Sequence, residues 1–257
     1  MRYLAVCLAA LAASGLTLFS GFGLGTLLLP VFAVFFPIEV AVAQTAAVHL
    51  ANNLFKLALF GRSTDRSVLR RFGLPATLAS FAGAALLLWL SRLPPLAVYT
   101  LGWRTCTVHP VKLTVAALML LFSLAELWPG RRELAFDRKW LPAGGLLSGF
   151  FGGLSGHQGA FRSAFLVRAG LSKEAFIGTG VAIACLVDLT RLTAYADLLG
   201  SPGLRASLGL VGAAALAAFL GAFIGSRLVR KITVRALQVA VAAMLLVLSA
   251  LLAAGIL

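Results

Sequence analysis

The sequence predicts an all-α polytopic membrane protein made of two inverted four-segment repeats, each starting with a broken helix, either re-entrant or a hairpin. Three observations predict this fold class. Of the 257 residues, 61% are hydrophobic and only 12% are charged, whereas soluble domains are nearer half apolar and a quarter charged. Two apolar runs are interrupted by dense glycine clusters. The basic residues fall mostly in the short gaps between apolar runs.

The composition excludes a soluble enzyme, a disordered chain and a disulfide scaffold, because a soluble fold of this size would expose large apolar patches. A net charge of +14 would suggest nucleic acid in a soluble protein. Here membrane topology explains it better, so we expect no nucleic-acid partner. Cys7, Cys106 and Cys185 lie far apart, and no zinc-ligand spacing, nucleophile elbow or phosphate loop occurs. We therefore expect no metal, no cofactor and no enzymatic activity.

Eight uncharged runs mark the membrane segments, since a helix needs about 20 residues to cross the ~30 Å hydrocarbon layer. Most of the runs fit one crossing, and the segment between the third and fourth is predicted to be an outer loop with an interfacial patch. In chain order the runs cover residues 3–36, 40–60 (interrupted only by Lys56), 72–91, 113–125, 140–161, 175–187, 206–226 and 236–257.

The first and fifth runs are predicted to be helix–break–helix elements. The first is too long for one ordinary span and contains Ser20-Gly-Phe-Gly-Leu-Gly25. The fifth contains Gly152-Gly-Leu-Ser-Gly-His-Gln-Gly159. Glycine clusters this dense break a helix. Non-helical backbone near mid-membrane is tolerated only where protein buries it or where it lines a polar interior.

A shift of 135 residues lays residues 20–57 on residues 155–192 without a gap. The matches fall on rare residue types: Ser20-Gly21 on Ser155-Gly156, Asn53 on Asp188, and Lys56 on Arg191. This predicts an N-terminal membrane repeat at 1–128, a polar connecting loop at 129–139 and a C-terminal membrane repeat at 140–257.

Charge favours broken elements that return to the side from which they entered. In that arrangement fourteen of the 22 Lys and Arg residues lie on one face and six on the other, with Lys56 and Arg162 inside the membrane. If both elements crossed, the split would be eleven against nine. Short cytoplasmic loops are enriched in Lys and Arg. The returning arrangement leaves an odd number of crossings per half, so the halves are inverted and both termini face outward.

The broken helices predict an anion site. Their second halves start near Gly25 and Gly159, and a helix start presents unpaired N–H groups and partial positive charge. Two such starts facing one interior would bind an anion, whereas the alternative is close helix packing through glycine. The candidate substrate-binding residues are Ser20, Gly21, Gly23, Gly25, Thr26, Ser155, Gly156, His157, Gln158, Gly159, Arg162 and Ser163.

Arg162 is costly inside a membrane and needs a partner. It is predicted to clamp an oxyanion, the alternative being an ion pair with Asp188 or Glu126. The candidate pathway or coupling residues occupy one face of each repeat's second span: His49, Asn52, Asn53 and Lys56, then Asp188 and Arg191.

Alternatives stay open for these pathway residues. Lys56 and Arg191 would guide an anion, unless Lys56 snorkels to the headgroups or Arg191 and Asp188 neutralise each other. His49 and His157 would carry protons or serve only in packing.

These residues carry a family resemblance. Gly21-Phe-Gly-Leu-Gly25 followed by Leu27-Leu-Leu-Pro30 resembles the first motif of the TauE/SafE sulfite exporter family, also called the toluene-sulfonate uptake permeases. Ser155-Gly-His-Gln-Gly159 followed by Arg162-Ser-Ala-Phe-Leu166 and Gly170-Leu-Ser-Lys-Glu-Ala-Phe176 is similar to the second motif in one branch of that family. Many members have three glycines where this chain has Gln158-Gly159-Ala160, and Arg162 is an addition.

The resemblance implies an eight-segment transporter in the cell inner membrane that moves sulfite or organosulfonates. We therefore expect a multi-pass secondary transporter, an exporter of small sulfur-containing anions that works by alternating access. An anion channel and a membrane-embedded enzyme are the alternatives. The expected partners are the anionic substrate and the lipid bilayer, and a homodimer stays open.

Overall fold

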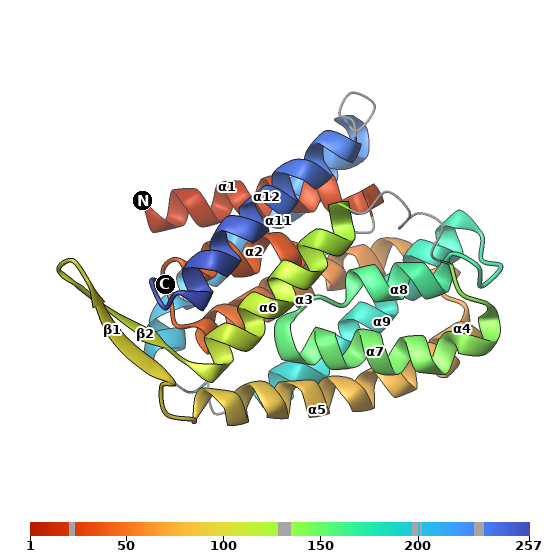
Figure 1. Cartoon of the computed structure of the whole chain (residues 1–257). Coiled ribbons are helices and arrows are strands. Elements are labelled where there is room, and N and C mark those ends of the chain that lie inside the picture. Colours follow the sequence, from red (N-terminus) through yellow and green to blue (C-terminus); the bar gives the residue numbers. More distant parts are fainter. Residues whose placement is uncertain (21–23, 128–134, 197–199, 201, 229–233) are drawn as a thin grey trace.

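The computed structural model describes residues 1–20, 24–127, 135–196, 200, 202–228 and 234–257. Within these ranges the side chains of residues 16–20, 104, 126, 202–206, 225–228, 234–238, 240 and 241 are not described. The described chain forms a bundle of helices with a β-hairpin at one end (Figure 1). It is mostly helical, in agreement with the sequence.

The helices of the first half are α1 (Arg2–Ser20), α2 (Leu24–Ala33), α3 (Ile38–Phe60), α4 (Arg66–Val68), α5 (Leu74–Ser91) and α6 (Pro110–Leu127). A 3-10 turn (Gly61–Ser63) follows α3, and a π-helical turn (Leu69–Gly73) joins α4 to α5. The helices of the second half are α7 (Leu141–Ser155), α8 (Gly159–Leu166), α9 (Lys173–Ala194), α11 (Pro202–Leu228) and α12 (Val234–Ala253). A 3-10 turn (Arg138–Trp140) precedes α7.

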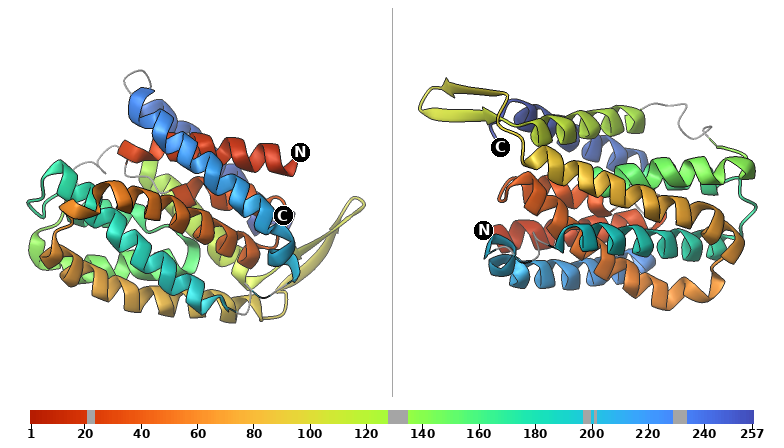
Figure 2. Two further views of the ribbon diagram at one scale, coloured as in Figure 1. Left: turned by 180° about the vertical axis from the view of Figure 1, so that it is seen from behind. Right: turned by 90° about the horizontal axis from the view of Figure 1, so that it is seen from below.

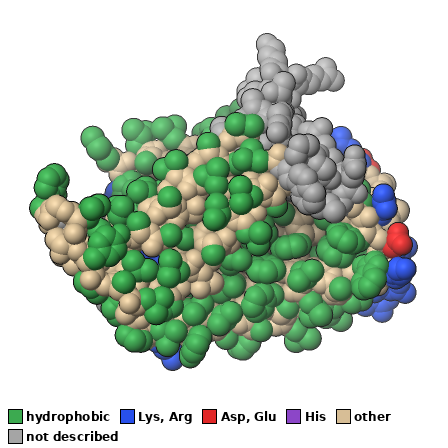
Figure 3. Space-filling view, viewed as in Figure 1, with side chains coloured by type: hydrophobic (Ala, Val, Ile, Leu, Met, Phe, Trp, Pro, Cys, Tyr) green, Lys and Arg blue, Asp and Glu red, His purple; other side chains and the backbone are tan. Residues whose placement is uncertain are grey.

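Three described helical stretches are long and apolar enough to cross a membrane: Arg66–Ser91, Lys173–Ala194 and Ser207–Ile224. Shorter apolar helices occupy Arg2–Gly15, Leu24–Ala33, Pro110–Ala125 and Ala242–Ala253. Hydrophobic side chains cover most of the face in Figure 3, whereas Lys and Arg gather at the end where α4 lies. Such a surface matches an apolar solvent around the middle of the bundle and water at its ends.

Helices pack in pairs drawn from opposite halves of the sequence. Helix α1 lies along α11, α7 lies along α5, α3 packs against α9, and α6 packs against α12 (Figures 1 and 2). The N- and C-termini lie at the same end of the bundle, opposite α4 (Figure 1). The halves are therefore interleaved, and the central pair α3–α9 brings their polar faces together.

Glycine permits the closest of these contacts. On α7, Gly145, Gly149 and Gly153 recur every four residues, and a Cβ at each would collide with a backbone carbonyl oxygen of residues 72–80 in and just before α5. On α11, Gly221 lies equally close to the Leu11 carbonyl of α1. Small residues let helix backbones approach in a membrane, where lipid supplies no hydrophobic drive for helix association.

The expectation of an all-α fold is wrong for residues 97–108. Strands β1 (Ala97–Leu101) and β2 (Arg104–Val108) form an antiparallel hairpin at the end that holds both termini (Figure 1). The segment is rich in Val, Thr and Tyr, which favour strands, and Gly102 takes the positive φ of +62° at the turn. The hairpin is fixed to the chain end, since Thr107 N–H donates to the Gly255 carbonyl at 3.3 Å.

Candidate functional site

The second predicted helix break is present, and the first falls on residues 21–23, outside the described residues. Helix α7 ends at Ser155, Gly156 adopts a left-handed φ of +82°, and α8 begins at Gly159. Helix α1 ends at Ser20 and α2 begins at Leu24, while Gly21 and Gly23 lie outside the described residues, as does the side chain of Ser20. Each interrupted element folds back, because α1 packs against α2 and α7 packs against α8.

The start of α2 meets the second break inside the bundle. A Cβ built on Gly25 would stand 3.4 Å from the carbonyl oxygen of Gly156 and 3.6 Å from Cγ2 of Thr45 in α3. Gly25, Gly156 and Thr45 are all buried. The start of α2 therefore lies beside the end of α7, so segments 131 positions apart in the sequence form one neighbourhood.

The polar face of α3 points into the bundle, as its spacing predicts. His49, Asn52, Asn53 and Lys56 are all at most 8% exposed. Asn52 accepts a 3.1 Å hydrogen bond from the Ser14 hydroxyl of α1 through its Oδ1. This face turns to α9, the corresponding helix of the second half.

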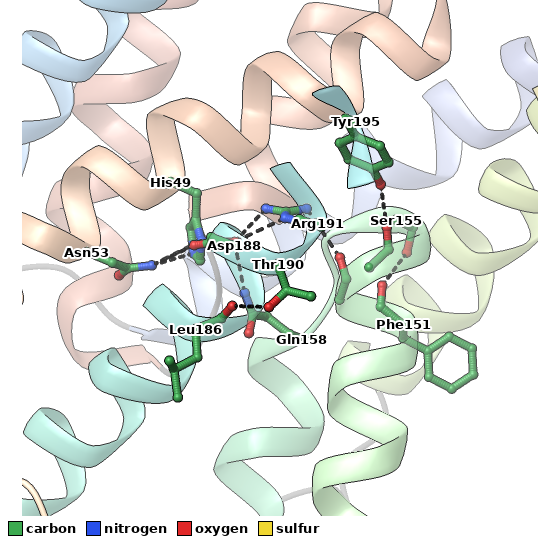
Figure 4. A network of polar contacts seen from close by, with 12 residues as sticks. His49, Asn53, Phe151, Ser155, Gln158, Leu186, Asp188, Thr190, Arg191 and Tyr195 are labelled. Atoms are coloured by element: carbon green, nitrogen blue, oxygen red, sulfur yellow. Dashed lines mark hydrogen bonds and ion pairs between the residues drawn. The ribbon is translucent and has the colours of Figure 1, made fainter. Parts of the chain in front are cut away.

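Asp188 is the centre of the polar network (Figure 4). Its Oδ2 lies 2.6 Å from Nδ1 of His49 and accepts from the amide of Asn53 at 3.3 Å. Its Oδ1 accepts from Nη2 and Nε of Arg191, at 2.8 and 3.1 Å, and from Nε2 of Gln158 at 3.2 Å. The carboxylate is fully buried, and this number of donors satisfies it there.

Arg191 is committed to this network. Besides Asp188, it donates from Nη1 to the Gly152 carbonyl at 3.2 Å, and it is fully buried. A Cβ on Gly156 would lie 3.0 Å from the same Nη1, so the absence of a side chain at Gly156 makes room for the guanidinium. Asp188 and Arg191 therefore neutralise each other, which is the second of the two alternatives given for Arg191.

Arg162 lies in the first turn of α8, where its Nη1 donates to Oε1 of Gln158 at 3.3 Å. Within the described residues Arg162 forms no direct ion pair with Asp188, although the two opposite charges attract each other in the interior. Asp188 is instead taken by His49 and Arg191. The side chain of Glu126, the other alternative, lies outside the described part.

Lys56 is 8% exposed, so its ammonium stays within the bundle and does not snorkel outward. Among the described residues it has neither a hydrogen bond nor an ion pair, and its charge interacts with that of Arg162. Burying a cation without a counter-charge is unfavourable. The described interior thus places Lys56, Arg162 and Arg191 against one carboxylate, Asp188.

The remaining predicted residues lie around the second break. His157 stacks on Phe122 with ring centroids 4.9 Å apart, and its Nδ1 lies 3.0 Å from the Ser155 hydroxyl. Thr26 is buried, whereas Ser163 is only partly so. Several buried polar atoms find no hydrogen-bond partner within the described chain: Gln44 Oε1, Thr45 Oγ1, Asn52 Nδ2, Thr64 Oγ1 and His157 Nε2.

Three buried contacts were not predicted. Gln44 donates to the Ser207 hydroxyl at 2.8 Å, Tyr195 donates to the Gly153 carbonyl, and Ser14 contacts Asn52. A usable signal was present for Tyr195, which continues the polar face of Asp188 and Arg191 at helical spacing. Ser14 and Ser207 carry no such signal, because one hydroxyl in an apolar helix is equally compatible with a bond to its own backbone.

One comparison with known proteins gives a match. The family described as Sulfite exporter TauE/SafE matches residues 6–252. Neither the curated proteins nor the solved structures give a significant match.

Proposed function

Because the chain belongs to the sulfite exporter TauE/SafE family, we propose that it exports small sulfur-containing anions, such as sulfite or organosulfonates, as a secondary transporter. The observation that carries the proposal is the excess of positive charge beside the second helix break, where Lys56, Arg162 and Arg191 face one described carboxylate, Asp188. Arg162 contacts only the neutral Gln158, and Lys56 contacts no anionic group, within the described residues.

An anion bound here would supply the missing counter-charge. The first N–H groups of α8 have no partner within their own helix and add partial positive charge. The Arg162 guanidinium can give two parallel hydrogen bonds to a sulfonate or sulfite, as it does to other oxyanions. Lys56 would add a point charge with rotatable donors. Together these groups favour a small anion with several oxygens over a cation or a neutral solute.

The arrangement of the halves suits alternating access. Residues 1–128 and 140–257 would be inverted repeats joined by the loop 129–139. The reciprocal pairing of α1 with α11 and α7 with α5 supports this, as does the common end of the two termini. One half would rock against the other around a site near mid-membrane, in the cell inner membrane. The membrane potential or protons would drive transport.

The test is flux through the purified protein in lipid vesicles. Vesicles loaded with unlabelled sulfite or methanesulfonate should accumulate the labelled anion from outside by exchange, whereas labelled choline should not enter. Exchange identifies a carrier, because a carrier turns over faster when both sides hold substrate. Anion flux that is unaffected by substrate on the opposite side would indicate a channel, and no flux of either anion would refute the proposal.

A further inference from the structure

The site described above holds a second feature that anion binding alone does not need. His49 of α3 and Asp188 of α9 form a buried ion-pair contact of 2.6 Å at the junction of the two halves. The ring nitrogen that faces the carboxylate is Nδ1. A carboxylate there fixes the neutral ring with its proton on Nδ1 and leaves Nε2 as the basic nitrogen.

The carboxylate also favours the charged ring. A proton added to Nε2 converts His49 to an imidazolium, and Asp188 stabilises that charge across the short contact, as the carboxylate does in a catalytic triad. The amide nitrogen Nδ2 of Asn53 lies 3.0 Å from Nδ1 and 3.4 Å from Nε2, so Nε2 has only the longer of these two contacts. The His49–Asp188 contact can therefore take up one proton without breaking.

Gln158 links this pair to the proposed anion site. Its Nε2 donates to Asp188 while its Oε1 accepts from Arg162. The amide can satisfy a carboxylate and a guanidinium only in this orientation, since the reverse would set oxygen against oxygen and donor against donor. Gln158 precedes the first residue of α8, so any shift in Asp188 is transmitted to the helix start and to Arg162.

We infer that the His49–Asp188 pair is a proton-binding site coupled to the anion site, so that one proton and one anion bind together. This inference rests on the proposed function. The added proton raises the positive charge that faces the anion, and the anion in turn stabilises the proton. Such coupling is reciprocal by thermodynamic necessity. It makes the transporter a proton–anion symporter, and the proton leaves Nε2 when the anion leaves. Because the inward proton gradient opposes outward movement of this pair, export by this route depends on a higher concentration of the anion inside the cell.

The other ionisable groups around the pair set this charge. Glu39 and Lys56 are on the same helix, and neither α2 nor α5 has a titratable side chain. Helix α11 carries Arg205 and Arg227, whose side chains are not described. Lys112 lies in the first turn of α6, and Arg2, Tyr3 and Cys7 lie in the first two turns of α1. On α8 and α9, the ionisable side chains whose charges interact with His49 or Asp188 are Arg162, Cys185 and Arg191. The guanidinium groups keep their charge throughout the range to be tested. Lys56 is common to the wild type and to His49→Gln, so the part of the pH dependence between 5.5 and 8 that His49→Gln abolishes is assigned to the pair.

The experiment uses methanesulfonate, whose charge is constant in this range, so that pH acts only on the protein. In wild-type vesicles the KM for methanesulfonate should fall by about fivefold or more from pH 8 to pH 5.5, the lower end of typical coupling. A dye inside the vesicles should report proton entry with the anion. His49→Gln, which keeps a donor for Asp188, should still transport, but with a flat pH profile and no proton entry.

His109→Gln is the matched control, because His109 lies just before α6 and outside this network. It should keep the wild-type profile. The coupling would be overturned if wild-type transport had a flat pH profile, or if His49→Gln kept the wild-type profile. Either result would leave the proposal of anion transport intact. A flat profile in His157→Gln alone would move the proton site to the other buried histidine and overturn the assignment. Absence of any anion flux in the wild type would overturn both proposals.

Discussion

Gly25 at the start of α2 and Gly156 at the end of α7 lie against each other. The Gly156 carbonyl oxygen is 3.4 Å from the place where a Cβ of Gly25 would stand. Each glycine belongs to one of the two helix breaks, so this contact joins the interrupted element of the first half to that of the second. Any motion between the halves has to act on it.

The first prediction concerns the size of the side chain at Gly25. Alanine should be tolerated, because 3.4 Å is an ordinary van der Waals contact for a methyl group. Valine adds two methyl groups in the direction of Gly156 and Thr45, and overpacking of this kind costs about 1–3 kcal/mol. Gly25→Val should lower the unfolding temperature in detergent and the transport rate, with Gly25→Ala as its control. Equal behaviour of the two variants would mean that the breaks separate during transport.

The second prediction concerns the uncompensated charge of Arg162. Arg162→Ala removes a charge-assisted hydrogen bond to the anion, worth about 1.5–3 kcal/mol, so KM for sulfite should rise by about tenfold or more. The unfolding temperature should not fall, because Arg162 has no ion pair to lose among the described residues. The KM of Arg162→Lys should lie between those of the wild type and Arg162→Ala, since lysine keeps the charge but not the planar guanidinium.

Arg168→Ala is the control for Arg162, because Arg168 is exposed just beyond α8. It should leave both the KM for sulfite and the unfolding temperature unchanged. A marked loss of stability in Arg162→Ala with an unaltered KM would show that Arg162 holds the bundle together and does not bind the substrate.

The third prediction concerns the carboxylate at the centre of the network. Asp188→Asn leaves the guanidinium of Arg191 buried without a counter-charge, and breaking a buried pair in this way costs about 3–5 kcal/mol. Adding Arg191→Met removes the stranded charge, so the double variant should be more stable than the sum of the single effects predicts. A double-mutant cycle of unfolding free energies measures this coupling, expected at about 0.5–3 kcal/mol. Additive effects would contradict the shared network.

The fourth prediction concerns the orientation of the chain. With inverted halves, both termini face outward, and a phosphatase that works only outside the cytoplasm should be active when fused after Leu257. The same phosphatase fused after Arg138, in the connecting loop, should be inactive, and a fluorescent protein that folds only in the cytoplasm should give the reverse pattern. Cytoplasmic activity at Leu257 would contradict the returning arrangement of the broken helices.

Sequence spacing was enough to place the second break at Gly156 and the polar face of α3. Glycine density and i, i+3, i+4, i+7 spacing are local properties, and they act through backbone freedom and helix geometry. For residues 97–108 the sequence predicts an outer loop, whereas the structure forms a β-hairpin there, because strand pairing depends on contacts between two short segments as well as on their β-branched residues. The sequence does not determine whether Asp188 pairs with Arg162 or with Arg191, because Arg191 is only three residues from Asp188 and both arginines are possible partners.

The sequence by itself determined the class of solvent, the helical segments, the two interruptions and the presence of more buried cations than anions, because these depend on composition and short-range periodicity. The tertiary structure alone decided which cations are neutralised. By packing α3 against α9, it places Asp188 within reach of His49, Arg191 and Gln158 and leaves Lys56 and Arg162 without a direct ion pair among the described residues. The physical reason is that electrostatic energy depends on distances of a few ångströms between side chains far apart in the chain, and only helix packing sets those distances.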